Sequence, residues 1–167
     1  MALTAVNPKI LETPSGGKLA EVSMLATNSK TWKKGELCIL ANGAGTVEPL
    51  DGADSRIYGV FLQDQDESTS STTVQVGVLE SGTVLEMYVT NNGNAAAINT
   101  ANIGVGYDAY EASGICYLDV NGTTGAQFKV RRLFNEYAAE LASRESYVAG
   151  TTAPGICEVV FTQAATA

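Results

Sequence analysis

Histidine is absent from this chain of 167 residues. Histidine is the commonest general base and a frequent zinc ligand, so its absence excludes the usual serine and cysteine triads and most zinc sites. Carboxylate pairs and lysine chemistry stay open as means of catalysis. No other pattern in the sequence supplies a catalytic set, so we expect a protein that is not an enzyme and that holds no metal and no cofactor.

Charged residues are also scarce, at 17% of the chain against roughly 25% in an average protein. Their balance is acidic, with a net charge of −8. Phosphate backbones repel such a surface, so we expect no nucleic-acid partner. No apolar run approaches the roughly 18 residues of a membrane span, and the N-terminus lacks the basic start and apolar stretch of a signal peptide. We therefore expect no membrane partner and no standard export signal.

The cysteines form no motif. Cys38, Cys116 and Cys157 are odd in number and lack C-x-x-C spacing, which argues against a disulfide framework and against a zinc site. Each lies in an apolar run with the character of a strand, so we predict three small buried side chains. Synthesis in a reducing cytoplasm follows as the expectation.

Residues 1–31 differ from the rest of the chain, because prolines and glycines interrupt them and no strand or helix period holds through them. We predict an extended N-terminal arm that docks on the body of the protein, residues 32–167, or on a partner. A frayed terminus is the alternative. The candidate contact residues are apolar side chains of the arm and the tryptophan that follows it: Leu3, Val6, Ile10, Leu11 and Trp32.

The body is rich in apolar residues, Thr, Ser, Asn and Gly, which is typical of short strands joined by turns. Alternation and turn signals predict a series of strands: 36–41, 45–50, 56–62, 73–79, 83–90, 104–112, 115–120, 126–134 and 155–161. Asn42-Gly43 predicts a hairpin between the first two strands, and Ser113-Gly114 another. The clearest hairpin signal joins 73–79 to 83–90.

Strands at this spacing indicate an all-β fold in one domain, a small β-barrel or β-tulip-like body of short antiparallel strands. Gly59 predicts a bulge or a close backbone approach within its strand. The segment 135–154 breaks the pattern and reads as an insertion. Its first part, residues 135–144, is rich in good helix formers and predicts at most one short helix.

Two sequence features suggest ligand sites weakly. Asp64, Asp66 and Glu67 loosely match a calcium loop but lack its glycine and its distant glutamate, so a solvated polar loop is the stronger interpretation. Gly104 and Gly106 form a G-x-G without the third glycine or the following helix of a dinucleotide site. We expect these glycines to serve strand curvature instead.

Two further groups of side chains allow a functional interpretation. Lys129 and Arg131 fall on one face of a predicted strand beside Arg132, and they either face solvent or pair with an acidic partner surface. The second group consists of tyrosines that, if exposed together, would stack on sugar rings: Tyr88, Tyr107, Tyr110 and Tyr117. Burial of these tyrosines in ordinary strands is the alternative.

Several stretches share the turns and alternation of a known family: residues 32–50, 56–64 and 72–87, and later 105–120 and 127–130. The matching parts are Lys34-Gly35-Glu36, Ile57 with Gly59-Val60, the alternating Val74 to Val78, and Gly82-Thr83 with Glu86. These stretches resemble the core of the capsid decoration proteins of tailed bacteriophages, also called cement or head-stabilising proteins.

The resemblance covers roughly residues 32–134, and 135–154 departs from it. It implies a structural virion protein, made in the host cytoplasm, that assembles as a homo-oligomer, often a trimer. Such proteins bind the outside of the capsid and bridge subunits of the major capsid protein. The alternative is a fibre or adhesin module that binds a cell-surface glycan. A small trimeric β enzyme, such as a nucleotide hydrolase, ranks lower because the sequence shows no phosphate-binding loop.

Overall fold

The computed structural model describes residues 6–27, 29–41, 45–54, 56–65, 72–94, 96–134, 146–149 and 155–162. The described residues form strands and one 3-10 turn, which confirms the all-β prediction. The elements are β1 (Lys9–Glu12), β2 (Ala20–Leu25), β3 (Leu37–Leu40), β4 (Val47–Pro49), β5 (Ala53–Asp54), β6 (Ile57–Phe61), β7 (Thr73–Val78), β8 (Val84–Thr90), β9 (Ala96–Asn99), η1 (Thr100–Asn102), β10 (Gly106–Ala112), β11 (Ile115–Asp119), β12 (Phe128–Phe134), β13 (Ser146–Ala149) and β14 (Ile156–Phe161).

Five strands form one antiparallel sheet in the order β2-β7-β6-β3-β4. The β3–β4 pair confirms that the first two predicted strands form a hairpin, and the turn predicted at Asn42-Gly43 lies outside the described residues. The sheet curls, because Ala26, just beyond β2, bridges Val47 of β4, and the Thr27 N–H donates to the Val47 carbonyl at 2.9 Å. A separate apolar cluster fills the inside of this curl: Ala26, Trp32, Cys38, Val47, Phe61, Val74 and Val76.

The larger sheet is barrel-like: β8, β11, β10, β12 and β14 are neighbours in this order, and β14 also pairs with β8. It is not a complete barrel, because some of these neighbours pair over only a small part of their lengths. Every pair is antiparallel except β8–β11. Of the neighbouring strands in this ring, β10 and β12 share the fewest residue pairs. The two pairs are Gly106 with Lys129 and Tyr107 with Phe128. β1 and β11 share one edge of β8: β1 pairs with residues 84–86 and β11 with residues 88–90, while β14 pairs with the other edge.

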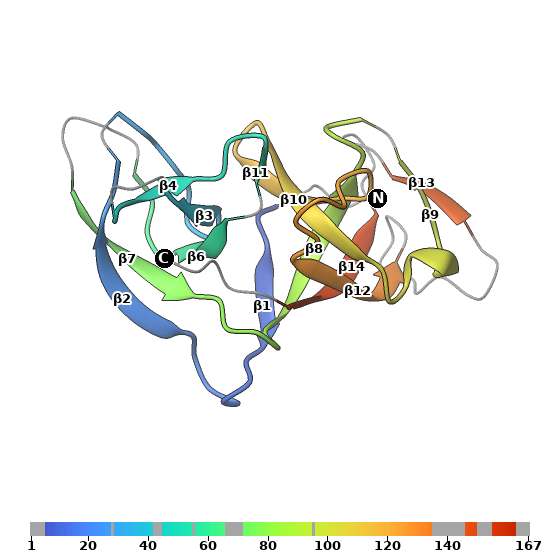
Figure 1. The fold of residues 1–167 in the computed structure, drawn as a ribbon, viewed down its shortest axis with the longest axis horizontal. Coiled ribbons are helices and arrows are strands. Elements are labelled where there is room, and N and C mark those ends of the chain that lie inside the picture. The colour runs from blue at the N-terminus through green and yellow to red at the C-terminus, as the bar shows by residue number, and fades with distance from the viewer. Residues whose placement is uncertain are drawn as a thin grey trace.

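One continuous apolar core joins the two sheets, which lie side by side with β1 between them (Figure 1). It contains Leu37, Ile57 and Leu79 from or beside the smaller sheet, and Leu85, Met87, Leu118, Phe128, Val130, Cys157, Val159 and Phe161 from the larger. Alternation in the sequence predicts Phe128 and Val130 on one face of β12, and Cys157, Val159 and Phe161 on one face of β14, and the burial of all five confirms this. The shared core makes the two sheets one body.

Gly59 confirms the predicted close approach. A Cβ added there would lie 2.7 Å from Cγ1 of Val76, and it would also collide with the Gly77 carbonyl oxygen on the neighbouring strand β7. The register of β3 against β6 shifts between Cys38 and Ile39, so a bulge accompanies the approach. Any side chain at residue 59 would push β6 away from β7.

The predicted hairpin between 73–79 and 83–90 is wrong, although both strands exist. β7 pairs with β2 and β6, whereas β8 pairs with β1, β11 and β14. The intervening turn carries the chain from one sheet to the other, and the Gly82 N–H donates to the carbonyl of Phe161 at 2.7 Å. Alternation sets where a strand runs and which face it buries, but its partners depend on the rest of the chain.

The described part of residues 1–31 lies on the body as two strands. β1 pairs with β8 and lies at one edge of the larger sheet, and β2 pairs along its full length with β7. Neither strand has a second neighbour along its length among the described residues. The helix predicted over 135–144 falls outside the described residues, and β13 of the same insertion pairs with β9.

Candidate functional site

The N-terminal strands carry most of the exposed apolar surface. Five large apolar side chains are well exposed among the described residues. Three of them belong to this segment: Val6 (56%), Leu11 (38%) and Leu25 (50%). We call these three side chains, with the outer edges of β1 and β2, the N-terminal surface. Leu3 of the predicted contact set lies outside the described residues. Exposed edges and apolar side chains together are features of binding surfaces.

The other two predicted contact residues point inward. Ile10 is half-buried against the main core. Trp32 is 3% exposed and stacks on Phe61 with ring centroids 4.3 Å apart. Its Nε1–H donates to the Gln63 carbonyl at 3.1 Å. Trp32 therefore anchors the start of the body, and the predicted contact set divides into an exposed and a packed part.

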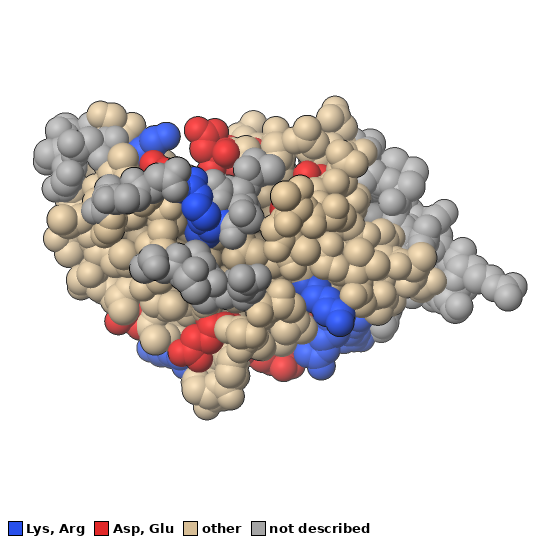
Figure 2. Space-filling view, in the orientation of Figure 1, with Lys and Arg blue, Asp and Glu red and all other residues tan. Residues whose placement is uncertain are grey.

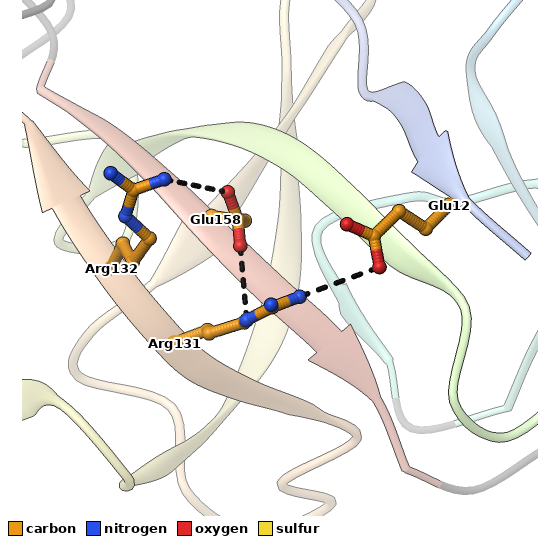
Figure 3. Close-up of polar contacts among 4 residues, drawn as sticks. All are labelled: Glu12, Arg131, Arg132 and Glu158. Carbon is orange, nitrogen blue, oxygen red and sulfur yellow. Dashed lines mark ion pairs between the residues drawn. The ribbon is translucent and has the colours of Figure 1, made fainter.

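A groove of about 670 Å³ lies under the connection from β1 to β2. Ile10, Leu11 and Leu19 line it from the N-terminal segment, and Leu62 lines it from the smaller sheet. Glu12, at the end of β1, also lines the groove and forms an ion pair with Arg131 of β12 (Figure 3). Because Leu11 belongs to both, the groove adjoins the N-terminal surface.

The two arginines of the basic cluster are paired within this chain (Figure 3). Arg131 Nε lies 3.2 Å from Glu158 on β14, and its Nη1 lies 3.6 Å from Glu12 on β1. Arg132 pairs with the other oxygen of Glu158 at 3.7 Å, and its guanidinium lies 5.2 Å from the centre of the Phe134 ring. A bulge between Val130 and Arg132 turns both arginines outward. Both have acidic neighbours in this chain, which supports the solvent-facing interpretation.

The tyrosines are mostly buried. Tyr88, Tyr107 and Tyr117 are 7%, 6% and 4% exposed, and Tyr110 is half-buried. Tyr117 lies opposite both Tyr88 and Tyr110 in the strand register. Tyr88, Tyr110 and Tyr117 are therefore neighbours, but within the packing of the sheet, whereas Tyr107 lies opposite Phe128. Their burial counts against a glycan-binding face.

Comparison of the chain with protein-family models, with curated proteins and with solved structures gave no match. No helix of the described residues has the length and hydropathy needed to cross a membrane. On the face drawn in Figure 2, basic and acidic side chains of the described residues are interspersed. The function therefore has to be argued from the surface, the cavities and the resemblance of the sequence.

Asp64 bonds to the backbone of this chain. Its Oδ1 accepts the Lys34 N–H at 2.6 Å, while Asp66 and Glu67 lie outside the described residues. Within the described ranges no three His, Cys, Asp or Glu side chains gather as a metal site. The three cysteines are fully buried free thiols, as predicted, and burial raises the pKa of Cys38 to about 12.

Two buried aspartates that the sequence did not single out fix the loops of the larger sheet. Asp108 and Asp119 face each other across β10 and β11 and are 7% and 3% exposed. Asp108 Oδ1 accepts the N–H groups of Gly125 and Ala126, and Asp119 Oδ1 accepts those of Asn92 and Asn121. Acidic residues next to a predicted loop are a weak sign of this role, since such residues are also common in solvated turns.

A second cavity, of about 850 Å³, lies where the chain before β1, the turn before β3 and the β10–β11 hairpin meet. Glu36, which the sequence presents only as part of the shared Lys-Gly-Glu pattern, lines it and is 4% exposed. Burial raises the pKa of Glu36 to about 7, while a backbone hydrogen bond from Lys33 lowers it and the charge of Glu111 raises it. A buried carboxylate in a cavity is a candidate binding group.

Proposed function

We propose that this chain is a structural virion protein that binds the outer surface of a tailed-phage capsid and stabilises it by bridging major capsid subunits. The observation that carries the proposal is the N-terminal surface, in which three exposed apolar side chains, just before β1, on β1 and on β2, accompany strand edges that have one neighbour among the described residues. The resemblance of residues 32–134 to decoration proteins supports the same role. Such a role requires contact area and symmetry and no catalytic group.

The edges of β1 and β2 suit addition of a strand or a flat surface from a partner. Each strand has one neighbour among the described residues, so backbone N–H and C=O groups on its other side are available for bonds to a partner. Val6, Leu11 and Leu25 add apolar area that becomes buried on contact. Backbone bonds and apolar burial together give both affinity and register.

A homotrimer would strengthen such a contact. Single protein contacts of ordinary size bury about 800 Å² per partner, and a symmetric oligomer engages several capsid subunits at once. A trimer also matches a local three-fold axis of a shell. Ile103 (44%) and Val105 (38%), the other exposed apolar side chains, are the candidate contact between copies of the chain.

Cryo-electron microscopy of the phage particles whose genome encodes the chain tests the proposal. Density for the body at regular sites between outer-shell subunits is the expected result, and it also counts the copies in each oligomer. Density on a tail fibre would instead indicate the adhesin function. Absence of the chain from purified particles would overturn the virion role.

A further inference from the structure

The cavity of about 850 Å³ has one wall that is held in place. Asn7 lines it, and its Nδ2 donates to the Gly114 carbonyl at 3.2 Å while its Oδ1 accepts the Cys116 N–H at 3.0 Å. These two bonds fasten the chain before β1 to the turn between β10 and β11. Leu50, Pro49 and Ile115 give the cavity apolar sides. The cavity is therefore formed before any ligand arrives, which lowers the entropic cost of binding.

Glu36 is the buried carboxylate of this cavity. Its Oε2 accepts the Lys33 N–H at 2.9 Å, and its other carboxylate oxygen makes no hydrogen bond or ion pair in the described part of the chain. Solvent reaches that oxygen, although the residue as a whole is only 4% exposed. A donor that displaced this water would form a charge-assisted hydrogen bond with the carboxylate.

The charges around the cavity favour a cation. Glu111, on the opposite wall, accepts the Gly114 N–H through Oε1 at 2.5 Å, and its charge acts on Glu36. Lys33 and Lys34 are exposed at the rim, where solvent and salt screen them. Lys30 lies 3.9 Å from Asp51. Buried Glu36 and half-buried Glu111 therefore set the field deep in the cavity, and the exposed lysines affect mainly its entrance.

The shape of the cavity favours an elongated organic cation. A metal ion would leave most of the volume empty, and no three acidic or thiol groups gather there among the described residues. Lysine and arginine side chains combine an apolar stem with a donor-rich positive head. Such a stem would lie along apolar lining residues such as Leu50 and Ile115, and its head would meet the carboxylates of Glu36 and Glu111, which line the same cavity.

We infer that this cavity binds the side chain of a lysine or arginine from a partner protein, with Glu36 and Glu111 holding its positive head. The inference deepens the proposed function, on which it rests for the identity of the partner, the major capsid protein. A charge-assisted hydrogen bond in a pre-formed pocket is the kind of contact that dominates an interface. It would fix the register of a surface that is otherwise mostly apolar.

The site carries its own dependence on pH. Only ionised Glu36 attracts a cation strongly, and its pKa is about 7. Affinity should therefore change little above that pH and fall by about tenfold for each unit below it. The other titratable or charged groups around Glu36 are Glu111 on β10, Cys116 on β11, Cys38 on β3, Lys33 and Lys34 in its own turn, and Lys30 and Asp51 across the cavity.

The test is a titration of the full chain with N-acetyl-arginine amide. Binding is followed by the fluorescence of Trp32, the single tryptophan, which lines the cavity. N-acetyl-citrulline amide, which replaces the guanidinium by a neutral urea, is the matched control probe. We expect saturable binding of the arginine probe at pH 8, at least about tenfold weaker binding of the citrulline probe, and about tenfold weaker binding of the arginine probe at pH 6.

Glu36→Gln keeps the shape of the side chain and should lower affinity for the arginine probe at least about tenfold. Glu21→Gln, on the exposed face of β2, is the control and should leave affinity unchanged. Equal affinity for the two probes, or unchanged binding in Glu36→Gln, would overturn the inference. We expect Glu36→Gln to be more stable than the wild type. Lost probe binding by a variant that unfolds at a higher urea concentration would therefore reflect loss of the site and not loss of the fold.

Measurement of capsid occupancy, beside probe binding, distinguishes failure of this inference from failure of the proposed function. Lower capsid occupancy of Glu36→Gln together with lost probe binding supports both. Lost probe binding with unchanged occupancy overturns the role of the cavity in capsid contact and leaves the decoration function standing. Probe binding by a wild-type chain that is absent from particles keeps the site and overturns the proposed function.

Discussion

The strands β2 and β8 contain similar apolar residues but differ sharply in burial. Six of the seven residues of β8 are buried, whereas none of the six in β2 is. β8 pairs with three strands and faces the main core, while β2 pairs with β7 alone. Apolar content therefore does not by itself bury a strand. A strand with one neighbour keeps surface and backbone groups that become available for binding between molecules.

The largest difference between the two regions should appear on truncation of core and edge side chains. Phe128→Ala, at a fully buried position in the ring, should lower the free energy of unfolding by about 3–5 kcal/mol. Leu25→Ala, at a position 50% exposed on β2, should cost less than about 1 kcal/mol. Urea unfolding of both variants measures this difference. Equal losses would show that β2 is packed as tightly as the ring.

Glu36→Gln should stabilise the protein in a pH-dependent way. The folded-state pKa of Glu36, about 7, lies above its usual value of 4.5, so between these pH values the folded state holds a proton that the unfolded state has lost. The stability of the wild type relative to Glu36→Gln should therefore fall as pH rises from about 4.5 to about 7 and then stay constant. The gain of the variant at pH 8 is up to about 3 kcal/mol.

Urea midpoints of the wild type and of Glu36→Gln at several values between pH 5 and pH 8 measure this effect. A matched Glu21→Gln variant, whose carboxylate is exposed on β2, should follow the wild type at every pH. A constant difference between Glu36→Gln and the wild type over this range would contradict the raised pKa.

Asp108→Ala should destabilise the larger sheet by about 2 kcal/mol, because the N–H groups of Gly125 and Ala126 lose their acceptor within a partly buried loop. Asp64→Ala removes an exposed bond to the Lys34 N–H and should cost less than about 1 kcal/mol. Thermal unfolding compares the two variants. Similar losses would mean that water readily replaces Asp108.

The smallest effect on stability should come from the N-terminal surface. Val6→Ser with Leu11→Ser should change the free energy of unfolding by less than about 0.5 kcal/mol. Capsid occupancy of the double variant should nevertheless fall clearly, because the exposed apolar area is lost. Glu80→Ser, at an exposed position of the turn before β8, is the control and should leave capsid occupancy unchanged. Deletion of residues 1–28 is a poorer test, since it removes β1 and β2 with their backbone bonds.

Much of the fold was predictable from local pattern. The alternation at Val74 and Val76 and at Cys157, Val159 and Phe161 predicted strands whose inward faces the structure confirms. Turn chemistry predicted the β3–β4 and β10–β11 hairpins. The turn at Gly82 was misjudged, because a tight turn between two alternating strands is equally compatible with a crossing between sheets.

The candidate sites were less predictable. Trp32 and Ile10 have the apolar character of contact residues, but the same character places them in a core when a neighbouring strand covers them. Glu36 stands in an ordinary polar turn of the sequence. It is buried only because residues distant in sequence, at the β10–β11 hairpin, pack over that turn.

The sequence by itself determined the strands, most of their inward faces and the absence of histidine chemistry, because these depend on neighbouring residues and on composition. Only the tertiary structure decided which strand edges stay exposed, which tyrosines are covered, and that Glu36 lies in a cavity opposite Glu111. The physical reason is that pairing and burial depend on contacts between segments far apart in the chain. A local pattern of alternation is compatible with several such arrangements.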